Sequence, residues 1–188
     1  MASIDASTSG AGGIITTADN TGTLQLKSGG TTIATINSTG LSMASGKLLA
    51  STGPTFRASK DSTQSISTST WTKIQFNIED WDTNSNYDNA TNYRFTPTVA
   101  GYYQVDLSVE FNNVSGSYIA AIYKNGSAYM FSPFYAGSTI GSTPSVHGLI
   151  YMNGSTDYIE GYAYTTTASQ SLYNGAATWF NASLARSA

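Results

Sequence analysis

The side chains with the clearest potential for catalysis are one histidine and a few carboxylates. His147 is the single histidine of the 188-residue chain, and the chain has no cysteine. A serine-type hydrolase needs a nucleophile and an orienting acid around its histidine, and no nucleophile-elbow motif accompanies His147. We therefore expect His147 to be structural or exposed.

Two carboxylates, Asp106 and Glu110, fall on one face of a segment that has the pattern of a strand. Their i and i+4 spacing separates them by about 13 Å along a strand, whereas the paired carboxylates of glycosidases lie roughly 5 to 9.5 Å apart. We therefore expect that the protein is not an enzyme. The alternative is a depolymerase whose catalytic carboxylates are brought together only by the fold.

A further group of acids lies in the polar stretch IEDWDTNSNYDNA. Asp80, Asp82 and Asp88 carry the oxygen ligands that calcium prefers, but their spacing matches no known calcium loop. We expect a solvated turn and no cofactor. Calcium bound by these three aspartates is the alternative.

Aromatic side chains are the strongest candidates for binding. Tyrosine combines an apolar ring with a polar tip, which suits subunit interfaces and flat polar ligands such as sugars. The predicted ligand-binding residues, all within SAYMFSPFYAG, are Tyr129, Phe131, Phe134 and Tyr135. The alternative is that most of these rings pack in the core or between subunits.

Strands must position these groups, and the clearest strand is GYYQVDLSVEF, residues 101–111. Its apolar and polar residues alternate, which predicts one buried and one wet face. Asn-Gly pairs at 125–126, 153–154 and 174–175 follow or precede strand-like sequence and are typical of type I′ hairpin turns. No helical period is present. About eight strands with such turns predict an antiparallel sandwich or jelly roll.

Two segments, residues 118–123 and 149–152, have apolar residues on both faces. A sandwich strand with two dry faces indicates that a second surface covers it, and we expect this surface to be another subunit. The predicted interface residues of a homotrimer are Ile119, Ala121, Ile122, Tyr123, Tyr151, Tyr162 and Tyr164.

The composition excludes several classes of partner. Only 10% of the residues are charged and the net charge is −3, so the chain lacks the basic surface that nucleic-acid binding needs. No apolar run approaches the length of about 20 residues that spans a bilayer. The N-terminus, MASIDASTSGAGG, lacks the basic start and apolar stretch of a secretory signal.

The chain divides by composition into three parts. Residues 1–13 are small and polar and predict a flexible or anchoring arm. Residues 14–53 contain the short strand-like runs TLQLK, TTIATIN and LSMASGKLL, each with too few large apolar residues to form a stable unit alone. They predict a β-rich trimeric stem, with a flexible linker as the alternative. Residues 54–188 predict the head domain.

From Pro54 to Ala185 the sequence resembles the globular head of the complement first-component q subunit (C1q), a jelly roll shared with the tumour necrosis factor family. The matching pieces are Phe56-Arg57-Ala58, residues 71–77, Phe95-Thr96-Pro97 with Gly101-Tyr102-Tyr103, Lys124-Asn125-Gly126, residues 148–151 with Asn153-Gly154, and residues 178–184. The resemblance implies a tight trimer around a threefold axis. A departure occurs at Gly154-Ser155-Thr156-Asp157, where the family has Gly-Asp.

The N-terminal third resembles the stem sequences of bacteriophage tail fibres. We therefore expect an all-β, non-enzymatic protein of a virion surface, on the tail, a vertex or the capsid exterior. The first hypothesis is a homotrimeric fibre or appendage that attaches to a host-surface glycan or protein. The alternative is a capsid decoration or head-fibre protein whose N-terminal arm binds other virion proteins. A secreted lectin-like ligand is a lesser alternative, which the missing secretory signal disfavours.

Overall fold

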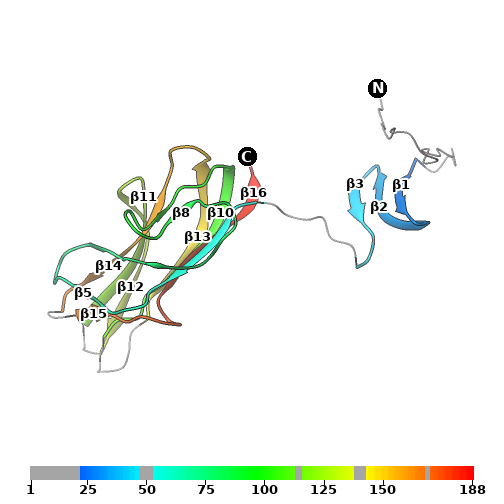
Figure 1. Cartoon of the computed structure of the whole chain (residues 1–188). Helices are drawn as coiled ribbons and strands as arrows, with labels where there is room; N and C mark the ends of the chain where they lie inside the picture. Colours follow the sequence, from blue (N-terminus) through cyan, green and yellow to red (C-terminus); the bar gives the residue numbers. More distant parts are fainter. Residues whose placement is uncertain (1–21, 47–52, 113–115, 138–142, 168–169) are drawn as a thin grey trace. The chain divides into compact units, whose positions relative to one another are not determined.

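A computed structural model describes residues 22–46, 53–112, 116–137, 143–167 and 170–188, and these residues form strands and no helix (Figure 1). The chain divides into two compact units, residues 1–51 and 52–188. The predicted arm, residues 1–13, lies outside the described residues. Within the described part of the chain, no helix is long and apolar enough to cross a membrane.

The first unit contains an antiparallel sheet of three strands in sequence order. They are β1 (Leu24–Ser28), β2 (Thr31–Asn37) and β3 (Gly40–Met43). Gly29 and Gly30 connect β1 to β2 with φ of 56° and 79°, the positive values that a tight hairpin turn requires. The Asn37 side chain closes the next turn by accepting a hydrogen bond from the Thr39 backbone N–H. We call this element the N-terminal sheet.

The N-terminal sheet has one apolar and one polar face. Its register places Leu24, Ile36 and Leu41 in one row across the three strands, and Leu26, Ala34 and Met43 in the next row. The other face carries polar residues such as Gln25, Thr35 and Ser42. Among residues 22–46 only Ala34 is buried, while the leucines and Ile36 are 40–55% exposed.

The second unit, the head, is a sandwich of two antiparallel sheets. The first sheet has the order β13 (Ser145–Asn153), β10 (Ala100–Ser108), β16 (Trp179–Ser187), β4 (Thr55–Ser59) and β7 (Ile78–Asp82). The second has the order β12 (Ser127–Ala136), β11 (Gly116–Lys124), β14 (Ile159–Thr165), β9 (Arg94–Phe95) and β8 (Tyr87–Asp88), with β6 (Thr72–Lys73) also paired to β14. A small ladder joins β15 (Gln170–Leu172) to β5 (Gln64–Ile66).

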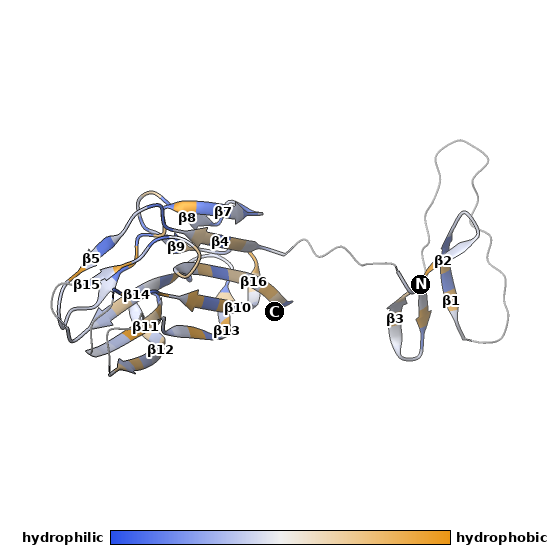
Figure 2. Cartoon of the chain, turned by 90° about the horizontal axis from the view of Figure 1, so that it is seen from below, coloured by the Kyte–Doolittle hydropathy of each residue, from blue (hydrophilic) through white to orange (hydrophobic). Residues whose placement is uncertain are grey.

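The head core lies between the two sheets. On β10 the predicted apolar face is fully buried, at Tyr103, Val105 and Leu107. The strand ends at Ser108, but Val109 and Phe111 continue into the same core. At its centre the Phe56 ring stacks on Phe95 with 4.5 Å between ring centroids. Figure 2 shows the alternation of apolar and polar residues along the strands.

Residues 71–78 alternate in sequence, which predicts one strand with Ile74, Phe76 and Ile78 on a common face, but the structure differs. Pairing breaks between β6, which belongs to the second sheet, and β7, which belongs to the first. Ile74 and Phe76 are fully buried, whereas Ile78 is 39% exposed. The chain crosses between the sheets at this point, so the period of two is interrupted.

The three Asn-Gly pairs also have different roles. Asn125 and Gly126, with φ of 52° and 79°, join the paired strands β11 and β12 in the predicted hairpin. The pair at 153–154 connects β13 to β14, and the pair at 174–175 connects β15 to β16; in both cases the two strands belong to different sheets. The hairpin prediction is therefore correct for the first pair and wrong for the other two.

Candidate functional site

The outer face of the second sheet carries a cluster of four aromatic rings. Tyr123 stacks on Tyr162 with 3.9 Å between ring centroids. Trp71, which directly precedes β6, lies against both Tyr123 and Tyr164, at 5.7 and 5.1 Å. We call Trp71, Tyr123, Tyr162 and Tyr164 the aromatic face. Trp71 was not among the predicted site residues. The sequence did carry a signal for it, because alternation places Trp71 on the same side of its segment as Lys73, the polar side.

The predicted ligand-binding residues lie on β12, the edge strand of the same sheet. Phe131 pairs with Ala121 in the neighbouring strand and Tyr135 with Ser117, so both lie on the side of the sheet that carries the aromatic face. They are 61% and 72% exposed. Phe134 pairs with the buried Tyr118 and lies on the opposite side, while Tyr129 lies at the β-bulge; both are exposed. The four residues do not form one cluster.

The predicted interface residues separate into three places. Ile122 is fully buried and belongs to the head core, because it alternates with Ala121 and faces the first sheet. The outer face of the second sheet carries Ile119, Ala121, Tyr123, Tyr162 and Tyr164. Tyr151 lies on the first sheet, where its ring approaches that of Tyr102 at 5.5 Å and where Leu149 is also exposed.

Charge beside the aromatic face is neutralised locally. Lys73 forms an ion pair with Glu160, whose side chain is buried, and lies opposite Tyr162 in the register. Burial, with a contribution from the Glu160 charge, raises the pKa of Tyr162 to about 12. Burial also raises the pKa of Tyr123. Both phenols therefore stay protonated at neutral pH and can donate hydrogen bonds.

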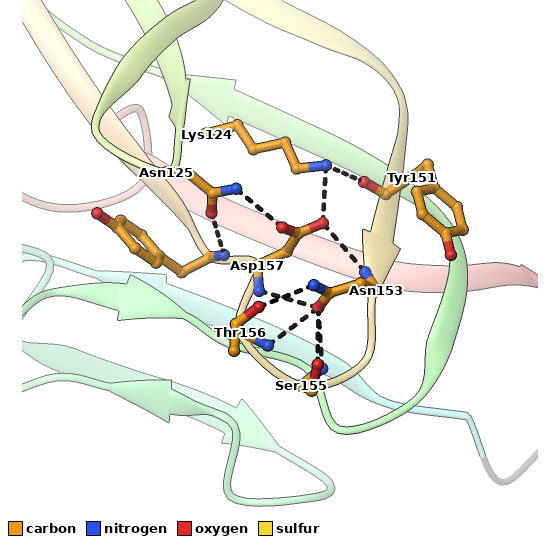
Figure 3. Close-up of polar contacts among 8 residues, drawn as sticks. Lys124, Asn125, Tyr151, Asn153, Ser155, Thr156 and Asp157 are labelled. Atoms are coloured by element: carbon orange, nitrogen blue, oxygen red, sulfur yellow. Dashed lines mark hydrogen bonds and ion pairs between the residues drawn. The ribbon is translucent and has the colours of Figure 1, made fainter.

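A closed set of polar contacts joins two turns at the end of the head that contains Pro54 and Ala188 (Figure 3). The Asp157 carboxylate lies 2.9 Å from Lys124 Nζ and accepts a hydrogen bond from Asn125 Nδ2 at 2.8 Å. The Asn153 side-chain oxygen accepts hydrogen bonds from the backbone N–H groups of Ser155, Thr156 and Asp157. The hydrogen bond from Lys124 is the main cause of the lowered pKa of Asp157. These groups satisfy one another, which indicates a structural role.

The three calcium candidates each have separate hydrogen-bond donors. Asp80 pairs with Arg57 at 3.2 Å, and Asp82 accepts hydrogen bonds from the backbone N–H groups of Asn84 and Tyr87. Asp88 accepts backbone hydrogen bonds from residues 90–92, which lower its pKa to about 2. In the described segments, no three acidic, histidine or cysteine side chains are grouped as a metal site requires.

His147 is exposed on the outer face of the first sheet, directly opposite Asp106. The Asp106 carboxylate accepts a hydrogen bond from Gln104 Nε2 at 3.0 Å. Glu110 lies beyond the end of β10, where its backbone N–H donates to Thr178 Oγ1. Asp106 and Glu110 therefore do not share a strand face, and of the two expectations for His147, structural or exposed, the structure shows an exposed side chain.

Comparison with known proteins shows the fold. No protein-family model and no curated protein sequence matches the chain. The globular domain of zebrafish complement 1qA is similar, with a TM-score of 0.56, 13% identity, and 72% of this chain and 99% of that chain covered. Murine APRIL is similar with a TM-score of 0.57 and 11% identity, and the match covers 70% of this chain and 98% of that chain. PRD1 vertex protein P5 is similar with a TM-score of 0.53 and 16% identity, and the match covers 73% of this chain and 100% of that chain. The predicted C1q and tumour necrosis factor jelly roll is confirmed.

Proposed function

We propose that this chain is a non-enzymatic structural protein of a virion surface, which forms a homotrimeric fibre or appendage that attaches to a host-surface glycan or protein. One observation carries the trimer: no other described part of its unit packs on the apolar face of the N-terminal sheet. An apolar face that stays this exposed is typical of a protein–protein interaction surface.

Copies of the same chain are the simplest covering layer. Each copy brings the same leucines, so three sheets that face a common axis cover one another, and closed symmetry is usual for homo-oligomers. The head offers a second exposed set on its first sheet, Tyr102, Leu149 and Tyr151. These residues offer a second surface for contacts between copies, within the head itself.

The aromatic face and the exposed residues of β12 support attachment. Phe131 and Tyr135 lie on the same side of the second sheet as the four clustered rings. Tyr and Trp at such a density are typical of recognition surfaces. We assign the receptor contact to this side of the head, in place of the subunit interface that the sequence predicted for Tyr123, Tyr162 and Tyr164.

The likeness to PRD1 vertex protein P5 favours a second candidate location on the capsid. In that case the chain decorates the shell or forms a head fibre, and residues 1–13 anchor it to other virion proteins. The two locations predict different copy numbers. Hundreds of copies per particle indicate decoration, whereas a few to a few tens indicate a tail or vertex appendage. Quantitative mass spectrometry of purified particles, with the major capsid protein as the standard, separates them.

Two further measurements test the proposal. Light scattering at micromolar concentration is expected to give three times the chain mass, and a monomer contradicts the trimer. Purified protein is expected to compete with particles for adsorption to host cells. Unchanged adsorption at saturating protein contradicts attachment and leaves the decoration role.

A further inference from the structure

The head contains a polar pocket that neither the proposed interface nor the aromatic face uses. It has a volume of about 310 Å³ and is lined by Lys60 and residues 62–65, together with Gln75, Asn77 and Tyr93. The first group follows β4, and Gln75 and Asn77 lie where the chain crosses between the sheets. Every one of these side chains can donate or accept hydrogen bonds.

Lys60 is the unusual member of this pocket. Its side chain is long and charged, yet the residue is only 5% exposed. The ammonium group donates hydrogen bonds to Gln64 Oε1 at 3.0 Å and to the Gln75 carbonyl at 2.9 Å, and both acceptors are neutral. Among the described residues it forms no ion pair. An ammonium group has three N–H donors, so one remains for another partner.

A buried cation without an anionic partner is unfavourable, because desolvation is repaid only by close opposite charge and complete hydrogen bonding. Burial lowers the pKa of Lys60, which is consistent with this cost. The neighbouring Asp61 carboxylate is exposed and accepts a hydrogen bond from Ser62 Oγ. Its charge opposes the effect of burial on the pKa of Lys60, but it forms no ion pair with the ammonium group.

We propose that this pocket binds the anionic group of a polyhydroxylated ligand, with Lys60 Nζ as the cationic partner. The charge of the ligand compensates the buried ammonium group, and the amide and hydroxyl side chains around it bind sugar hydroxyls. The volume accommodates a single sugar unit. This inference rests on the proposed function, because it adds to the contact at the aromatic face a second, separate contact in the head, with an acidic or phosphorylated sugar of a host-surface glycan.

Calorimetric titration of the intact protein tests the proposal with three probes. Sodium glucuronate and glucose 6-phosphate carry different anionic groups, and glucose is the neutral control. At least one of the charged sugars is expected to bind ten or more times more tightly than glucose, and the tighter one identifies carboxylate or phosphate as the natural group. Equal binding of all three, or no binding, overturns the proposal.

Two variants locate the binding. Lys60→Met removes the charge and is expected to abolish the preference for the charged sugar, whereas Lys27→Met, an exposed lysine of the N-terminal sheet, retains it. Because Lys60 also holds Gln64 and Gln75, Ser65→Trp provides a second variant: it fills the pocket from an exposed position and is expected to weaken binding at least tenfold. Wild-type affinity in folded Lys60→Met or in Ser65→Trp overturns the proposal.

The outcome is separable from that of the proposed function. Binding of glucuronate without competition for host adsorption supports the pocket and contradicts attachment. Competition for adsorption without any charge-dependent sugar binding supports attachment and overturns the pocket.

Discussion

In the N-terminal sheet the large apolar side chains remain exposed, whereas in the head they are buried between two sheets. Both regions consist of antiparallel strands with alternating sequence, and both use Gly or Asn with positive φ in tight turns. They differ in the number of layers. The head has a second sheet to cover the first, whereas the described residues of the first unit, 22–46, form a single sheet. Alternation thus gives a strand an apolar face, and a covering layer decides whether that face is buried.

The largest effect is expected inside the head. Phe180 is fully buried and its ring contacts those of Phe56, Phe76 and Tyr87. Phe180→Ala is expected to lower the free energy of unfolding by about 3–5 kcal/mol, because it removes a large side chain and leaves a cavity. Urea denaturation of the full chain measures this.

Trp179 is the matched control for Phe180, since it occupies the other face of the same strand. Its ring lies under the Arg57 guanidinium at 4.8 Å and is partly exposed. Trp179→Ala is expected to cost about 1 kcal/mol. Equal costs at the two positions contradict the assignment of core and outer face.

A smaller effect is expected in the N-terminal sheet. Leu41→Ser is expected to weaken association by about 1–2 kcal/mol per copy, because roughly half of this side chain is left to be buried by other copies. The free energy of unfolding of the head stays unchanged. Analytical ultracentrifugation across a dilution series measures the association, with Ser42→Ala on the polar face as the control. Unchanged association in Leu41→Ser contradicts the role of this face.

Acid should act on the head and not on the N-terminal sheet, because residues 22–46 contain no Asp, Glu or His. In the folded head the pKa of Asp157 is lowered, and that of Asp88 is lowered to about 2. A carboxyl group whose pKa is lower in the folded state than in the unfolded state stabilises the fold at any pH above its unfolded-state pKa. This stabilisation is lost as the pH falls through the folded-state pKa. The head is therefore expected to lose stability as the pH falls from about 4 to about 2.

Thermal unfolding at several pH values checks this, and Asp88→Asn is expected to reduce the slope over that interval. An unchanged slope in Asp88→Asn indicates that other carboxylates cause the acid sensitivity.

The smallest effect on stability is expected at the aromatic face. Trp71→Ala removes ring contacts to Tyr123 and Tyr164 and is expected to cost about 0.5–1.5 kcal/mol. If this face contacts the receptor, the same variant loses its ability to compete for host adsorption. Trp81→Ala, which removes an exposed tryptophan from the first sheet, is the matched control and is expected to retain competition.

The sequence correctly predicted strands that stay within one sheet along their whole length. The alternation of residues 101–111 identified the buried face of β10, and the three apolar runs of residues 22–46 correspond to β1, β2 and β3. It was less successful where the chain changes sheets. Residues 71–78 have the pattern of one strand because the alternation continues where the chain crosses from one sheet to the other. Two Asn-Gly turns join strands of different sheets, because a positive φ allows a tight turn but does not determine which strand the next one pairs with.

The candidate site shows the same limit. Exposed aromatics on β12 were identified from their residue types, but Trp71 joins Tyr123 and Tyr164 across strands that are far apart in the chain. Lys60 gave no signal at all, since a lysine in a polar loop is normally exposed. Its burial depends on Gln64 and Gln75, and only the folded chain brings them to it.

By itself the sequence determined the all-β class, the apolar faces of the strands, the turn positions and the low surface charge, because alternation and backbone preferences act over a few residues. The tertiary structure decided which strands pair, which aromatic rings gather on one face, and which lysine is buried without an ion pair. These depend on contacts between distant segments, whose energies exceed local preferences once two sheets pack together.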